Sequence, residues 1–129
     1  MRIICVDDHP LHLIDLKETI KDFVPEADVV TFRKPREAQE DAAQNGCDVL
    51  ICEISLADGD GILLAEALQA ANPQLNIIFT TVCDARERAD EVLRLRPSGY
   101  LKKPYTQSQL QQELRMLRYP VWDKPLCAT

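Results

Sequence analysis

The chain has 129 residues, of which 46% are hydrophobic and 28% charged, and its formal net charge at pH 7 is -6. This length fits one globular domain with a two- or three-layer core. The acidic balance argues against a nucleic-acid-binding surface in this segment, since phosphate contacts need a basic face. No apolar run reaches the ~20 residues of a membrane span, and the first residues lack a signal-peptide pattern. We therefore expect a cytoplasmic protein without membrane contact.

The five cysteines are an odd number and include no CxxC pair: Cys5, Cys47, Cys52, Cys83 and Cys127. Three of them lie in or beside apolar runs, where a free thiol behaves as a small hydrophobic side chain. We predict reduced core thiols rather than disulfides or zinc ligands, as is usual in a reducing compartment.

Short apolar runs alternate with amphipathic helices along the chain. Apolar runs at 3–6, 29–32, 49–52, 77–79 and 100–101 predict five strands. Helical spacing predicts helices between Pro10 and Pro25, over about 35–45 and 62–71, around Ala85, Ala89, Val92 and Leu93, and around Leu110, Leu114 and Leu117. Five β-then-α units with continuously apolar strands predict an α/β fold, a five-stranded parallel sheet with helices on both faces.

The periodic pattern ends near Leu117, and the residues after it include two prolines and Trp122. We therefore predict one domain over residues 1–118. Residues 119–129 are predicted to form a linker or tail that could lead to an output domain outside this chain.

Charged and hydroxyl side chains follow several of the predicted strands, where open α/β sheets bind their ligands. Asp7 and Asp8 follow the first strand, Glu53 ends the third, Thr81 ends the fourth, and Lys103 follows the fifth. Three neighbouring carboxylates raise one another's pKa unless a cation is present. Mg²⁺ prefers such oxygen ligands. The sequence therefore predicts a magnesium site with Lys103 as a second positive charge.

These residues resemble the receiver domain of two-component response regulators, over about residues 1–117. The matching segments are Val-Asp-Asp at 6–8, Leu-Ala-Asp-Gly-Asp-Gly at 56–61, Thr81, and Tyr-Leu-Lys-Lys-Pro at 100–104. The resemblance implies a flavodoxin-like, doubly wound (βα)5 fold with strand order 2-1-3-4-5. It also implies a signalling switch rather than an enzyme.

The resemblance implies a role for each matching residue. Asp7, Asp8 and the residue at position 53 would bind Mg²⁺, together with the backbone carbonyl of Ser55. Thr81 and Tyr100 would be the switch residues, and Lys103 would pair with the acceptor carboxylate and its phosphoryl oxygens. The implied partners are a sensor histidine kinase and an output domain or partner protein, with transcription as the expected output.

A homodimer through the fourth helix, fifth strand and fifth helix is a further expectation. The fourth helix carries charges of both signs: Arg86, Glu87, Arg88, Asp90, Glu91 and Arg94. Mixed signs suit self-complementary pairing about a two-fold axis, and they suit a solvated helix face equally well.

Glu53 stands where the family places the aspartate that becomes phosphorylated. The extra methylene adds about 1.5 Å of bond length, and a misplacement of about 1 Å can reduce a rate on the order of a hundredfold. We therefore expect altered or lost phosphorylation. The longer side chain also moves charge outward, toward the place of a phosphoryl group, but with at most -1 against about -1.5 to -2 for phosphate.

Three interpretations of Glu53 follow. It holds the domain partly active, it makes the domain inert to phosphorylation and regulated by partners, or it is an engineered phosphomimetic substitution in an ordinary receiver. We favour a natural receiver that works independently of phosphorylation.

Two other functions fit the fold class less well. A magnesium-dependent phosphohydrolase of the haloacid-dehalogenase type needs a DxD pattern, which Asp-Asp-His-Pro at 7–10 does not supply. A flavin mononucleotide site needs a first loop of Ser, Thr and Gly that cradles phosphate, whereas an acidic pair repels it. The histidines are assigned no function: His9 is expected in the loop, and His12 exposed on the first helix.

Overall fold

The computed structural model describes residues 1–82 and 85–119. Five parallel strands form the central sheet: β1 (Arg2–Val6), β2 (Asp28–Phe32), β3 (Val49–Glu53), β6 (Asn76–Thr81) and β7 (Gly99–Lys102). Their order across the sheet is β2-β1-β3-β6-β7. Counting these five strands alone, the order is 2-1-3-4-5, which confirms the predicted flavodoxin-like topology.

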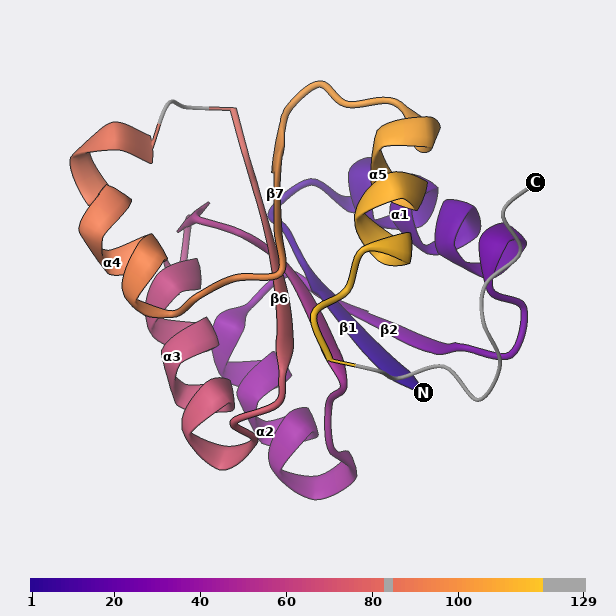
Figure 1. The fold of residues 1–129 in the computed structure, drawn as a ribbon. Coiled ribbons are helices and arrows are strands. Elements are labelled where there is room, and N and C mark those ends of the chain that lie inside the picture. Colours follow the sequence, from indigo (N-terminus) through magenta and orange to yellow (C-terminus); the bar gives the residue numbers. More distant parts are fainter. Residues whose placement is uncertain (83–84, 120–129) are drawn as a thin grey trace.

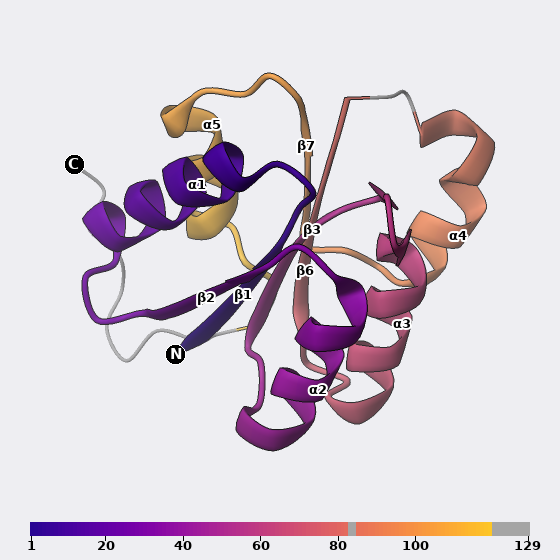
Figure 2. The same cartoon turned by 180° about the vertical axis from the view of Figure 1, so that it is seen from behind.

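Helices cover both faces of this sheet (Figure 1, Figure 2). One face carries α1 (Pro10–Phe23) and α5 (Gln107–Arg115), and the other carries α2 (Pro35–Asn45), α3 (Gly61–Ala71) and α4 (Ala89–Arg94). Successive strand residues point to opposite faces. Ile3 and Cys5 therefore belong to the core under α1 and α5, while Ile4 and Val6 belong to the other core. Two separate apolar cores result, one on each face.

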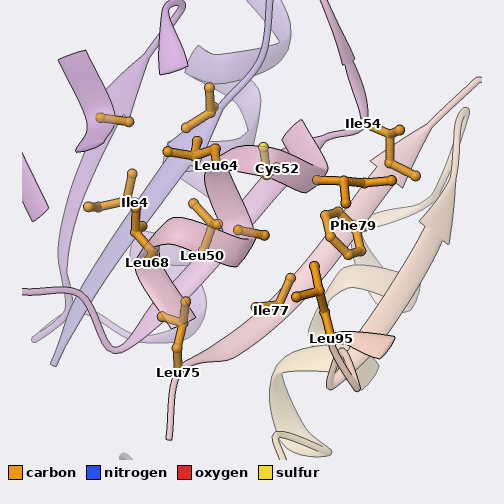
Figure 3. Close-up of a cluster of buried hydrophobic side chains, with 14 of the residues drawn as sticks. Ile4, Leu50, Cys52, Ile54, Leu64, Leu68, Leu75, Ile77, Phe79 and Leu95 are labelled. Carbon is orange, nitrogen blue, oxygen red and sulfur yellow. The ribbon is translucent and has the colours of Figure 1, made fainter. Parts of the chain in front are cut away.

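Figure 3 shows the core beneath α3, where strand and helix side chains interdigitate. Leu50 on β3 and Phe79 on β6 are fully buried, and Leu64 and Leu68 of α3 pack in the same cluster. This packing fixes β3 and β6 in the middle of the sheet. The carboxyl ends of these strands therefore lie in fixed positions.

Two local features differ from the sequence-based expectation. The loop after β3 forms an antiparallel pair of short strands, β4 (Ser55–Leu56) and β5 (Gly59–Asp60). The fourth helical segment begins as a 3-10 helix, η1 (Ala85–Arg88), before α4. Val92 of α4 and Leu95 directly after it are buried, whereas Leu93 is 68% exposed. A 3-10 turn has three residues, so it shifts the phase of the helix that follows.

The cysteine prediction is confirmed for the residues that the structure describes. Cys5 and Cys52 are buried, Cys47 is half-buried, and all three are free thiols. Cys83, Cys127 and Trp122 lie outside the described residues. Tyr119, the first residue assigned to the tail, exchanges two hydrogen bonds with the Asn76 side chain, both 3.0 Å long. Among the described segments, none of the helices has the length and apolar character needed to cross a membrane.

Candidate functional site

The carboxyl ends of four neighbouring strands bring the predicted site residues to one edge of the sheet. Asp7 follows β1, Glu53 ends β3, Thr81 ends β6, and Lys103 follows β7. Lys103 Nζ lies 2.6 Å from Asp7 Oδ2 and 3.1 Å from Glu53 Oε1. The carboxylate side chains are only 2% and 8% exposed. The negative charge at the end of the buried strand β3 is therefore compensated by a lysine 50 residues later.

Asp7 accepts further hydrogen bonds from the segment that follows it. The His9 backbone N–H donates to Asp7 Oδ1 over 3.0 Å, and His12 Nδ1 lies 2.8 Å from Asp7 Oδ2. Burial by itself would raise the pKa of Asp7, but the bonds from His12, Lys103 and His9 outweigh it and hold the pKa below its usual range. Asp7 is therefore a carboxylate that can only accept, so His12 donates to it through Nδ1–H.

The expectation that His12 is an exposed helix residue is wrong. Its side chain is 24% exposed, and its second ring nitrogen, Nε2, lies 2.7 Å from the Tyr105 hydroxyl oxygen. The two rings meet edge to face, with centroids 5.6 Å apart. Burial, together with neighbouring negative charge, raises the pKa of Tyr105, which keeps the phenol protonated. Asp7, His12 and Tyr105 thus form a continuous hydrogen-bonded chain from the sheet edge to the start of α5.

The carboxylates of Asp7 and Glu53 also determine the pKa of Lys103. Burial lowers its pKa, but the hydrogen bonds and charges of Asp7 and Glu53 outweigh burial and raise the pKa above its usual value. Lys103 is therefore a cation at every pH at which the fold is expected to work.

Glu53 uses both carboxylate oxygens inside the protein. Oε1 accepts from Lys103, and Oε2 accepts the backbone N–H of the next residue, Ile54, over 2.7 Å. The backbone around it is tightly packed. Gly61 donates its N–H to the Ile54 carbonyl over 2.8 Å, and a Cβ on Gly61 would lie 2.0 Å from the Glu53 carbonyl oxygen. Only glycine fits at this close approach of α3 to the end of β3.

Asp8 and Ser55 lie on the outer side of this edge. Asp8 is half-buried, and its Oδ2 accepts the Ala57 backbone N–H over 2.9 Å, while Ser55 is exposed on β4. Residues 1–82 and 85–119 contain no group of three or more His, Cys, Asp or Glu side chains that could hold a metal ion. Of the predicted Mg²⁺ ligands, the carboxylates of Asp7, Asp8 and Glu53 each accept hydrogen bonds from the protein.

The two predicted switch residues lie on adjacent strands. Thr81 ends β6 and is 2% exposed, and its carbonyl accepts the Lys103 backbone N–H over 2.8 Å. Tyr100 lies on the edge strand β7 and is 37% exposed. The backbone thus connects Thr81 directly to Lys103, while Tyr100 faces the outer surface.

Some of the charged residues in η1 and α4 form ion pairs within the chain. Arg88 Nη2 lies 2.5 Å from Asp60 Oδ2 and 2.9 Å from Glu91 Oε2. Asp60 Oδ1 in turn accepts the Ile62 N–H and caps α3. Burial would raise the pKa of Asp60, but Arg88 and the Ile62 N–H lower it. Arg88 therefore links η1 to the loop after Glu53. The side chain of Arg86, named in the dimer prediction, lies outside the described residues.

A doubly wound α/β domain with a buried carboxylate–lysine cluster at the carboxyl edge is the architecture of a signal-receiving module. The family model described as the response regulator receiver domain matches residues 3–115. The chain belongs to this family.

Curated relatives are transcriptional regulators. The chain is 28% identical over 112 residues to the transcriptional regulatory protein ZraR of Escherichia coli (strain K12), covering 87% of this chain and 25% of ZraR. It is 28% identical over 117 residues to the transcriptional regulatory protein YpdB of the same strain, covering 91% of this chain and 47% of YpdB. The chain thus spans between a quarter and a half of these proteins.

Solved structures agree with the fold. RcsB from Salmonella enterica serovar Typhimurium, bound to promoter rprA in the presence of phosphomimetic BeF3-, aligns with a TM-score of 0.77 at 26% identity, over 94% of this chain and 70% of RcsB. The chemotaxis protein CheY4 of Vibrio cholerae aligns with a TM-score of 0.78 at 22% identity, over 88% of this chain and 95% of CheY4. The second likeness concerns the fold alone.

Proposed function

We propose that this chain is the receiver domain of a transcriptional response regulator that signals without phosphorylation, because Glu53 stands at the acceptor position. The observation that carries the proposal is the state of the Glu53 carboxylate. Both of its oxygens already accept hydrogen bonds, from Lys103 and from the Ile54 N–H, and its side chain is 8% exposed.

These contacts oppose phosphoryl transfer. An acceptor oxygen must lie in line with the phosphorus atom and its leaving group, so catalysis depends on positioning. Glu53 folds back onto its own strand end, and an attacking oxygen would first have to leave Lys103 or Ile54. The same fold-back keeps the charge inside the protein. This favours a domain that is inert to phosphorylation and regulated by its partners over one held active by mimicry.

Mg²⁺ is part of the proposal. Asp7, Asp8 and Glu53 bring hard carboxylate oxygens to one sheet edge, and the Ser55 carbonyl follows directly in the loop, so the donor set fits this ion in its chemistry. A bound ion would neutralise carboxylate charge beside Lys103. An ion that bound through Asp7 Oδ2 would have to replace Lys103 or His12, because both already donate to that oxygen.

The signal would pass to the next protein or domain by contact with the face formed by α4, β7 and α5. Leu93 on α4 is 68% exposed and Tyr100 on β7 is 37% exposed, so apolar surface is available there for an output domain, a partner protein or a second copy. In this scheme Thr81 and Tyr100 act as the switch, and a sensor histidine kinase would be an input that Glu53 has weakened or removed. We place this signalling in the cytoplasm.

The test is the intact mass of the protein after incubation with a small-molecule phosphodonor and Mg²⁺, with Glu53→Asp treated in parallel. We expect a phosphoryl adduct on Glu53→Asp alone. As a control, Glu53→Asp combined with Asp7→Ala should lose the adduct, because the site then lacks a metal-binding carboxylate. An adduct on the unaltered protein that maps to Glu53 would overturn the proposal.

A further inference from the structure

His12 is placed to control Asp7. It lies in the first turn of α1, and its ring joins two groups that are far apart in the sequence, Asp7 and Tyr105. Its side chain is 24% exposed, whereas that of Asp7 is 2% exposed. The ring therefore separates a buried carboxylate from more open space at the side of α1.

That space is a cavity of about 650 Å³ between α1 and the segment from Lys103 to α5. His12 and Tyr105 line it together with Leu16 and Leu110. This volume lies in the range of small-molecule sites. A His12 ring that left Asp7 would remain beside the Tyr105 hydroxyl in a cavity open to solvent, so the movement does not require the core to open.

One oxygen of Asp7, Oδ2, has no capacity left for another partner. A carboxylate oxygen offers about two lone-pair sites. Oδ2 accepts from Lys103 over 2.6 Å and from His12 over 2.8 Å, and Oδ1 accepts the His9 N–H over 3.0 Å. The His9 bond belongs to the backbone turn before α1, and Lys103 also compensates Glu53. His12 is thus the donor whose loss disturbs the fold least.

We propose that His12 is a positioning residue that competes with a divalent cation for Asp7 Oδ2. The Tyr105 hydroxyl, bonded to the second ring nitrogen, strengthens the hydrogen bond from His12 to Asp7. Metal binding through Asp7 Oδ2 then requires His12 to withdraw toward the cavity, since Lys103 is held by Glu53 as well. A molecule that engages His12 or Tyr105 there changes the metal affinity of Asp7, and the metal changes the affinity for that molecule by the same factor. This inference rests on the magnesium site of the proposed function and adds a means of regulating it.

The experiment is a calorimetric Mg²⁺ titration of the unaltered protein and of His12→Phe, which keeps a ring but removes both hydrogen bonds. A hydrogen bond to a charged group is strong enough that its removal should tighten Mg²⁺ binding by about three- to tenfold. Tyr105→Phe leaves the bond to Asp7 in place and should tighten binding by about twofold. His9→Ala is the matched control, because its side chain is exposed and its backbone N–H is retained.

A rescue variant separates positioning from a general effect on the fold. The side-chain amide of His12→Asn places a donor near the position of Nδ1, so we expect Mg²⁺ affinity close to that of the unaltered protein, while thermal unfolding checks that each variant is folded. Tighter binding by His12→Phe, reversed in His12→Asn, supports the inference. Equal or weaker binding by a folded His12→Phe overturns it and leaves the magnesium site standing. Absence of Mg²⁺ binding in every variant removes both, whereas the phosphodonor experiment still decides the role of Glu53.

Discussion

The two edges of the central sheet carry the same ionic arrangement in different surroundings. At the amino edge, Arg2 pairs with Asp28 over 3.3 Å and with Asp41. At the carboxyl edge, Lys103 pairs with Asp7 and Glu53. Asp28 is 66% exposed and Asp41 is 19% exposed, whereas Asp7 is 2% exposed. Water can reach the partners of Arg2, above all Asp28, more easily than it can reach Asp7, so the carboxyl edge depends on its lysine more strongly.

The largest effect should come from removing the buried cation. Lys103→Met leaves Asp7 and Glu53 close together without a positive partner, and breaking a buried ion pair lowers the free energy of unfolding by about 3–5 kcal/mol. Urea denaturation at neutral pH measures this. Lys102→Met is the matched control, because its exposed side chain lies one residue away. A loss of less than about 1 kcal/mol, typical of exposed pairs, would mean that the ion pairs at the carboxyl edge contribute no more than surface ion pairs do.

The second effect is the loss of stability at acid pH that comes from protonation of Asp7. The pKa of folded Asp7 lies below its unfolded value of about 3.9. Its contribution to stability is therefore complete above that pH and is lost as the pH falls toward the folded pKa. A paired carboxylate of this kind contributes on the order of 2 kcal/mol. Urea midpoints between pH 5 and 3 should fall less steeply for Asp7→Asn than for the unaltered protein. Parallel curves would assign the acid sensitivity to other carboxylates.

The smallest effect should come from the amino edge. Arg2→Met removes two ion pairs, but Asp28 is exposed and Asp41 keeps a hydrogen bond from Asn45, so we expect a loss of about 1 kcal/mol in the free energy of unfolding. Repeating the urea denaturation at high salt tests the physical cause, because salt screens exposed pairs more than buried ones. The difference between Arg2→Met and the unaltered protein should shrink in salt. A loss as large as that of Lys103→Met would erase the contrast between the two edges.

Much of this architecture could be predicted because its signals are local. Continuous apolar runs identify the five strands, and the rule that ligands gather at carboxyl ends of strands brings Asp7, Glu53 and Lys103 together. The 3-10 helix before α4 could not be predicted, because a segment of four residues has no periodicity that separates it from an α-helix. The β4–β5 pair could not be predicted either, because each strand has only two residues and so shows no alternating pattern.

The contacts of His12 escaped prediction for a different reason. Its position five residues after Asp7, in the first turn of α1, is a local signal that the ring can turn back to the carboxylate. Its second partner, Tyr105, is 93 residues away, and no spacing in the sequence relates the two. The pair forms only because α1 and α5 pack on the same face of the sheet. A sequence pattern can therefore suggest half of this chain of contacts.

The close approach of Gly61 to Glu53 restricts how a longer acidic side chain can be accommodated. Because a single methyl group on Gly61 would collide with the Glu53 carbonyl, the main chain at position 53 has no room to retreat from the pocket. If Glu53 takes the place of an aspartate, as proposed above, the extra methylene has to be absorbed by rotation within the side chain, and the bond from the Ile54 N–H to Oε2 fits such a rotation. A rigid backbone at this point would then convert a longer side chain into a different direction of its carboxylate.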